Sequence, residues 1–177
     1  QLSQYYGAKD FENLRKSLAH SYRLTAFIAA GVLILSQSFA SLVLTGLHTP
    51  SNIIGMSLLY LRIIFCGIPA TAAYNMFASA LRAMGNSKTP LTAMIIASVL
   101  NVSLDILFVA GFGWGVAGAA IATVIAQSFS AVYCFLILRR IDIVHLTRAD
   151  FMPASGMNAR LMKLGIPVVF QNIIIGV

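Results

Sequence analysis

The residue best suited to chemistry in this sequence is Asp105, a carboxylic acid inside the apolar segment 89–110. Asn101 precedes it by four residues, so on a helix the amide and the carboxyl share one face. A carboxylate in a membrane-spanning helix costs about 2.5–3.5 kcal/mol on insertion scales, so it normally faces the protein interior or a water-filled cavity. Asp105 is therefore a candidate site for exchanging a proton or a cation. The alternative is a protonated Asp105 that ties two helices together through hydrogen bonds.

The composition predicts that this carboxyl group lies in a membrane. The chain has 177 residues, of which 59% are hydrophobic and only 10% are charged. Soluble domains have about 25% charged residues, so the chain is predicted to be an all-α, polytopic membrane helix bundle. Its net charge of +7 does not indicate a nucleic-acid partner, because the basic residues flank the apolar runs instead of forming one stripe.

The apolar runs divide the chain into segments. An amphipathic cytoplasmic segment is predicted over 1–23, and the spacing of its apolar residues favours a short interfacial helix over a solvated loop. Residues 139–163 form a basic stretch that is too long for a tight hairpin, so we expect a cytoplasmic linker followed by the start of a further membrane helix over 164–177. Because the sequence starts without Met and stops within an apolar run, we expect a fragment. The four predicted membrane-spanning helices are 24–47, 58–81, 89–110 and 116–138.

The basic residues also predict the orientation. In an alternating topology, residues 1–23, 82–88 and 139–163 lie on one side and hold every Lys and Arg except Arg62. Positive loops stay in the cytoplasm, so this side is predicted to be cytoplasmic. Arg62 lies near the start of its predicted span and is expected to extend toward the outer interface as an anchor.

Further polar residues in the spans are candidates for lining a cavity. They share helical spacing or stand in the middle of an apolar helix, although interhelical packing and hydrogen bonding explain them equally well. Pro69 is expected to kink the second span because it lacks a backbone donor. The candidates are Gln37 in the first span, Thr71, Asn75 and Ser79 at successive fourth positions of the second, and Thr123 and Gln127 in the fourth.

Signatures of enzymes and cofactors are not found in the sequence. The spans contain no paired carboxylates and no Ser/His/Asp arrangement, and the glycine-rich run at 111–118 lacks the Lys and Ser/Thr of a phosphate-binding loop. Cys66 and Cys134 are predicted at different membrane depths, which disfavours a disulfide. We therefore expect neither an enzyme nor a cofactor.

Several stretches of the chain resemble one transporter family. The stretches are QYYGAKD, YNMFASALRAMGNSKTPL, LNVSLDILFV, GVAGAAIATVIAQ and KLGIPVVFQN, in this order. They resemble the bacterial MATE (multidrug and toxic compound extrusion) transporters, and the resemblance covers essentially the whole chain. It implies a partial N-terminal lobe of a two-lobe transporter, from the third to the sixth helix, followed by the start of the second lobe.

The resemblance also implies a function and a site. Asn101 and Asp105 match the Asn-x-x-x-Asp pair of the family's first-lobe cation site, Thr123 matches its threonine, and Asn75 matches its asparagine. These four residues would bind the coupling ion, a proton or sodium. The implied activity is antiport that exports organic, often cationic or aromatic compounds across the bacterial inner membrane. The implied partners are the small-molecule substrate, the lipid bilayer, and the missing N-terminal helices and C-lobe of the same chain.

Two other functions compete with this one. A lipid-linked oligosaccharide flippase of the same superfamily would be expected to line its cavity with Arg or Lys, whereas Arg62 is the only basic residue inside a predicted span. A non-transporting membrane scaffold subunit would have no need for the Asn101–Asp105 pair, although it could tolerate one.

Overall fold

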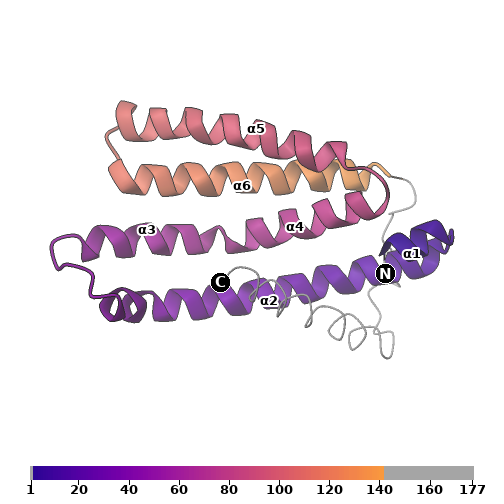
Figure 1. The fold of residues 1–177 in the computed structure, drawn as a ribbon, viewed down its shortest axis with the longest axis horizontal. Helices are drawn as coiled ribbons and strands as arrows, with labels where there is room; N and C mark the ends of the chain where they lie inside the picture. Colours follow the sequence, from indigo (N-terminus) through magenta and orange to yellow (C-terminus); the bar gives the residue numbers. More distant parts are fainter. Residues whose placement is uncertain (1, 142–177) are drawn as a thin grey trace.

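The structure is a computed structural model that describes residues 2–141, and all of its regular elements in that range are helical. Most of the predicted linker 139–163 and all of the predicted helix 164–177 lie outside the described residues. Figure 1 shows the helices as a row of long, nearly parallel rods. The elements are α1 Leu2–Gly7, α2 Phe11–Gly46, α3 Ile54–Cys66, α4 Ile68–Ala83, α5 Lys88–Asp105, the π-helix η1 Ile106–Gly111, and α6 Gly115–Arg139.

Four of these rods are long and apolar enough to cross a membrane, which confirms the predicted all-α membrane bundle. They are α2, the α3–α4 pair, α5 with η1, and α6. Helix α2 packs against α3 and α4, and the opposite side of the α3–α4 rod packs against α6 (Figure 1). Helix α6 also packs along α5, so it lies between α5 and the α3–α4 rod (Figure 1).

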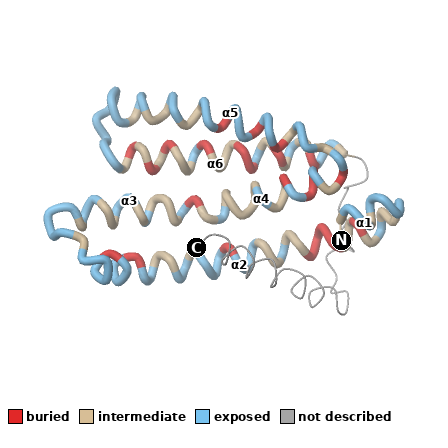
Figure 2. Tube along the Cα trace, in the orientation of Figure 1, coloured by how far each residue is buried: buried red, intermediate tan, exposed pale blue. Residues whose placement is uncertain are grey.

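Helix α6 is the most buried of the four rods, as Figure 2 shows. Small residues allow this close packing, because Gly118, Ala120, Ala122 and Ala126 are all buried on α6. Large apolar side chains on the other helices are exposed instead: Phe27 on α2 is 73% exposed and Val99 on α5 is 64% exposed. Such faces suit contact with lipid tails.

The first span begins earlier than its sequence predicts. Helix α2 starts at Phe11 and continues without a break to Gly46, so there is no boundary between a separate amphipathic segment 1–23 and a span 24–47. Its 36 residues extend about 54 Å, longer than the ~30 Å core of a bilayer. Leu14 and Leu18 are fully buried in one apolar cluster with residues of α4 and α6. Leu14 and Leu18 of the amphipathic stripe therefore pack on other helices of the protein.

The second span is interrupted at Gly67, two residues before Pro69. Pro69 stands in the first turn of α4, where its missing donor leaves no helical hydrogen bond unmade. Gly67 is needed here for space: a Cβ atom would lie 2.9 Å from Gln127 Oε1 and 3.1 Å from Val124 Cγ2. The predicted kink is thus a break between two helices, and it lies beside Val124 and Gln127 of α6.

The third span ends in a π-helix that its sequence pattern did not predict. After Asp105 the backbone widens: Phe112 N donates to Leu107 O at 2.9 Å, and Trp114 N donates to Phe108 O at the same distance. Wider turns of this kind are frequent at functional sites. Gly118 of α6 makes room for this segment, since a Cβ atom there would lie 2.9 Å from Phe108 Cβ and 3.2 Å from its carbonyl carbon.

Substitution Gly118→Ala should therefore destabilise the protein. The new methyl group would press on the backbone of η1, and overpacking of this kind costs about 1–3 kcal/mol. Gly31→Ala is the matched control, because a Cβ atom at this helical position of α2 meets no atom within 4 Å. We expect the control to keep or raise stability. The free energy of unfolding of the full-length protein in mixed micelles measures both, and a Gly118→Ala variant as stable as the control would contradict this packing.

Candidate functional site

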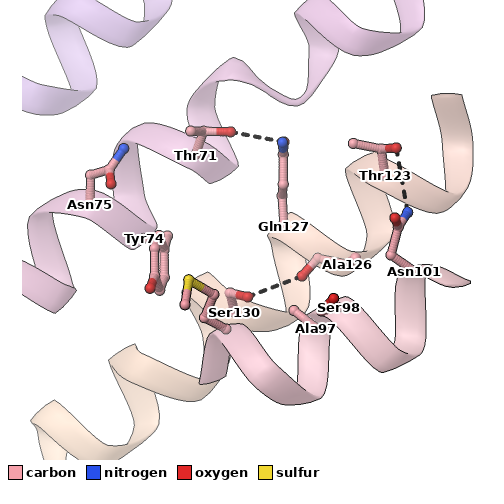
Figure 3. Close-up of a pocket in the computed structure, with 11 residues that line it drawn as sticks. Thr71, Tyr74, Asn75, Ala97, Ser98, Asn101, Thr123, Ala126, Gln127 and Ser130 are labelled. Atoms are coloured by element: carbon pink, nitrogen blue, oxygen red, sulfur yellow. Dashed lines mark hydrogen bonds between the residues drawn. The ribbon is translucent and has the colours of Figure 1, made fainter. Parts of the chain in front are cut away.

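Polar side chains from three helices meet in a pocket of about 350 Å³ between α4, α5 and α6 (Figure 3). Its wall is mostly apolar, with a few polar groups, as is usual for small-molecule sites. Thr71, Tyr74 and Asn75 come from α4, Met94, Ala97, Ser98 and Asn101 from α5, and Thr123, Ala126, Gln127 and Ser130 from α6.

Helix α6 supplies a polar stripe to this pocket. Thr123, Gln127 and Ser130 are spaced by four and three residues, so they share one helix face. Each forms a hydrogen bond to another helix. Ser130, which is buried, has its hydroxyl 3.5 Å from Ala93 O on α5 and 3.3 Å from Ala126 O on its own helix. The stripe therefore links α6 to both of its neighbours.

One pair of this stripe joins α6 to α4. Thr71 Oγ1 donates to Gln127 Oε1 at 2.8 Å, and the same hydroxyl is 3.2 Å from Gly67 O (Figure 3). Gln127 reaches this position only because Gly67 has no side chain. The break between α3 and α4 thus brings Thr71 into contact with α6.

A second pair joins α5 to α6. Asn101 Nδ2 donates to Thr123 Oγ1 at 3.4 Å, and Thr123 in turn donates to Ala119 O at 3.0 Å. Within residues 2–141, Asn101 Oδ1 accepts no hydrogen bond. The structure therefore brings together two of the predicted cation-site residues and leaves a carbonyl oxygen available as a ligand.

Asp105 lies one helical turn, about 6 Å along the axis, beyond Asn101 and does not line the pocket itself. The residue is half-buried and is the last of α5, where the helix passes into η1. Its Oδ1 atom is buried and has no hydrogen-bond partner within the described part of the chain. An unpaired buried carboxylate oxygen is costly, so a proton or a small cation would stabilise it.

The other predicted residues separate into two groups. Asn75 lies on the exposed side of α4 and lines the pocket one turn from Thr71 (Figure 3). Ser79 does not line it, and its hydroxyl instead accepts from Arg82 Nη2 at 3.4 Å. Gln37 is also outside, on α2, where its Nε2 donates to Arg62 O at 2.9 Å. Of the four residues that were candidates only for lining a cavity, Thr71 and Gln127 therefore line this pocket, and Ser79 and Gln37 do not.

Sequence reasoning missed three polar residues of the pocket. Ser98 precedes Asn101 by three residues, and Ser130 follows Gln127 by three, so each lies on a face already identified. That spacing could have identified both. Tyr74, whose hydroxyl donates to Pro90 O at 3.2 Å, carries no comparable signal, because its ring also belongs to an apolar face.

The chemistry of this region is that of hard oxygen donors. Carboxylate, amide and hydroxyl oxygens bind protons and small, hard cations such as sodium. Groups of three or more His, Cys, Asp or Glu that could hold a transition metal do not occur in the part of the chain that the structure describes.

Comparisons with known proteins agree with this architecture. The family model named MatE matches residues 2–107. The chain is 33% identical over 174 residues to "Probable multidrug resistance protein YpnP" of Bacillus subtilis (strain 168), covering 98% of this chain and 39% of that protein. It is 28% identical over 182 residues to "Probable multidrug resistance protein YoeA" of the same strain, with the same coverage. The chain thus spans about two fifths of the length of these relatives.

The fold is also similar to that of a solved transporter. The structure described as an inward-facing conformation of a multidrug resistance MATE family transporter of the MOP superfamily aligns with a TM-score of 0.87 and 24% identity. The alignment covers 94% of this chain and 38% of that one. The family model matches more than half of the sequence, and the four membrane-spanning rods have the same fold as the aligned part of the solved transporter. This chain therefore belongs to the MatE family of multi-pass membrane transporters.

Proposed function

We propose that the full-length protein exports organic, often cationic or aromatic compounds in exchange for protons or sodium ions. The observation that carries this proposal is the buried Asp105 Oδ1 without a partner, one turn from the Asn101–Thr123 pair. The names of the relatives, which describe multidrug resistance proteins, support the substrate class.

The exchange follows from the charge on Asp105. A deprotonated carboxylate attracts a cation or a cationic substrate, and it lies one helical turn beyond Asn101, which lines the pocket. A bound proton or sodium ion cancels that attraction, and α5 can then repack against α6. Alternating access requires two packings of these helices, one that binds the ion more tightly and one that binds the substrate more tightly. Each ligand then stabilises the packing that it binds more tightly.

Asn101 and Thr123 couple the charge to the packing of the helices. Their hydrogen bond joins α5 to α6. Asn101 precedes Asp105 by four residues, so a change of charge at Asp105 occurs one helical turn from this contact. Asn75, across the pocket on α4, offers a further amide to an ion or a substrate. These four residues are the proposed coupling site.

The proposed location is the inner membrane of a bacterium, with the basic ends of the helices in the cytoplasm. In the structure Arg82 and Lys88 flank the turn between α4 and α5, and Arg139 ends α6. The turns at the opposite ends, after α2 and before α6, contain no Lys or Arg. This asymmetry follows the positive-inside rule.

An efflux assay of the full-length protein tests the proposal. Membrane vesicles are loaded with a fluorescent organic cation, and proton and sodium gradients are imposed separately. Export driven by at least one gradient is expected. Absence of gradient-driven export of any tested cation would contradict antiport.

Asp105→Asn should abolish ion-coupled export while leaving expression intact, because it removes the exchangeable charge and keeps the size of the side chain. Asp10→Asn is the matched control: Asp10 caps α2 by accepting from Asn13 N at 3.2 Å, and asparagine caps helices equally well. Transport at wild-type rates by Asp105→Asn would reject the role of this carboxyl. Loss of expression would indicate instead that it holds helices together.

Asn101→Ala should weaken coupling less than Asp105→Asn, because it removes one neutral ligand and the bond to Thr123 but keeps the charge. We expect the ion concentration for half-maximal export to rise about three- to tenfold, corresponding to roughly 0.7–1.4 kcal/mol. Ser103→Ala is the control, since within the described residues the Ser103 hydroxyl bonds only to Val99 O of its own helix, at 2.8 Å. An unchanged ion dependence in Asn101→Ala would remove Asn101 from the site.

A further inference from the structure

A second cavity of about 320 Å³ lies between α2 and α4, and it shares no lining residue with the polar pocket. Small-molecule sites in proteins begin at about this size. Most of the wall consists of small apolar side chains, and none of the lining residues is charged. A charged ligand would lose its hydration here without gaining a counter-charge, so the cavity suits an uncharged compound.

One end of this cavity is aromatic. Tyr22 of α2 and Phe77 of α4 both line it, and their ring centroids are 5.5 Å apart with an angle of 54° between the planes. Met76, which precedes Phe77, also lines it and carries a polarisable sulfur that makes favourable contacts with rings. Aromatic rings pack against a further ring more favourably than burial of the same area by a saturated chain would predict. This end of the cavity therefore favours an aromatic ligand.

Two hydroxyl groups at the same end have no hydrogen-bond partner within residues 2–141. They belong to Tyr22 and Thr25, which are three residues apart on α2 and share the helix face that lines the cavity. A hydroxyl group surrounded by hydrocarbon without a partner is costly. An acyl chain in the cavity would leave both hydroxyls unpaired, whereas a compound with a hydroxyl or carbonyl group can bond to them. The hydroxyls therefore favour an aromatic compound that carries one polar group.

The aromatic end lies toward the basic ends of the helices, since Arg82 follows Phe77 by five residues near the end of α4. From Tyr22 the cavity extends along α2 to Leu33, a distance of 11 residues or about 17 Å. This is close to the thickness of one hydrocarbon leaflet, about 15 Å. Ala30, which lines the cavity, is exposed. A compound dissolved in this leaflet can therefore enter the cavity sideways, with its polar group toward the membrane surface.

We propose that the cavity between α2 and α4 binds an uncharged compound of two or three fused aromatic rings, with its rings against Tyr22 and Phe77 and its polar group on the hydroxyls of Tyr22 and Thr25. This site is additional to the polar pocket and contains none of the proposed coupling residues. Binding here needs no ion gradient. The export proposal can therefore fail while this one holds, and the reverse.

Equilibrium binding of tritiated 2-naphthol to the full-length protein in lipid nanodiscs, with the signal of empty nanodiscs subtracted, tests the proposal. The wild type should bind saturably. The double variant Tyr22→Phe/Thr25→Val keeps the ring and the side-chain sizes but removes both hydroxyls, and it should bind about tenfold more weakly. The matched control is Tyr133→Phe/Thr92→Val, which makes the same changes at residues that do not line the cavity. This control should bind as the wild type does.

A second variant fills the space of the cavity. Ala30→Phe adds a ring from an exposed position and should weaken binding at least tenfold, whereas Val99→Phe, on the exposed face of α5, should leave it unchanged. Wild-type binding by Ala30→Phe would place the ligand elsewhere and overturn the proposal. If Ala30→Phe does not fold, the double variant, which adds no atoms to the cavity, decides the question.

The saturated analogue decahydro-2-naphthol measures the contribution of the rings on the unmodified protein. It keeps the hydroxyl group and should bind about tenfold more weakly than 2-naphthol. Equal binding of the two compounds, or equal binding of 2-naphthol by the double variant and its control, would overturn the proposal. So would absence of saturable binding by the wild type, because lipid or another part of the full-length protein would then fill the cavity.

Discussion

Polar groups inside a bilayer need partners within the protein, and in this chain α6 supplies three such partners to its neighbouring helices. Thr123, Gln127 and Ser130 each form a hydrogen bond to α4 or α5. The alternative partner, water, is absent from the hydrocarbon layer, so these bonds specify which helix faces meet. Small residues on α6 bring the neighbouring backbones close enough for such bonds to form. The polar pocket is the space that remains between the three helices.

Two irregular segments of backbone position polar groups of the candidate site between these helices. The break at Gly67 brings Thr71 to Gln127, and the π-helix after Asp105 ends the regular part of α5 at the carboxylate. Both depend on glycines that approach another segment, Gly67 beside Gln127 and Gly118 beside Phe108. In a membrane such departures from the regular helix are tolerated only where protein or a cavity covers them. Their position beside the pocket suits a region that changes its packing.

Much of this arrangement follows from the sequence, because hydropathy and helical spacing are strong signals in membrane proteins. They predicted four membrane-spanning rods. The family resemblance, and not the spacing, implied that Asn101 and Thr123 belong to one site, and the structure joins them by a hydrogen bond. Spacing could not predict which neighbour each face meets: Gln37 contacts α3, and Ser79 contacts Arg82 of its own helix, so neither lines the polar pocket. The early start of α2 was missed because Leu14 and Leu18 are buried by residues far along the chain. The π-helix was missed because it depends on the approach of Gly118.

The central claim is that Asp105 holds the ion that substrate displaces. The most direct test is to measure ion release from the purified full-length protein when a cationic substrate is added, with a pH indicator for protons and a sodium electrode for sodium. The account predicts release of one of these ions by the wild type and none by a variant that carries Asn in place of Asp105. Equal release by the two proteins would contradict it, because the exchanged ion would then be bound elsewhere.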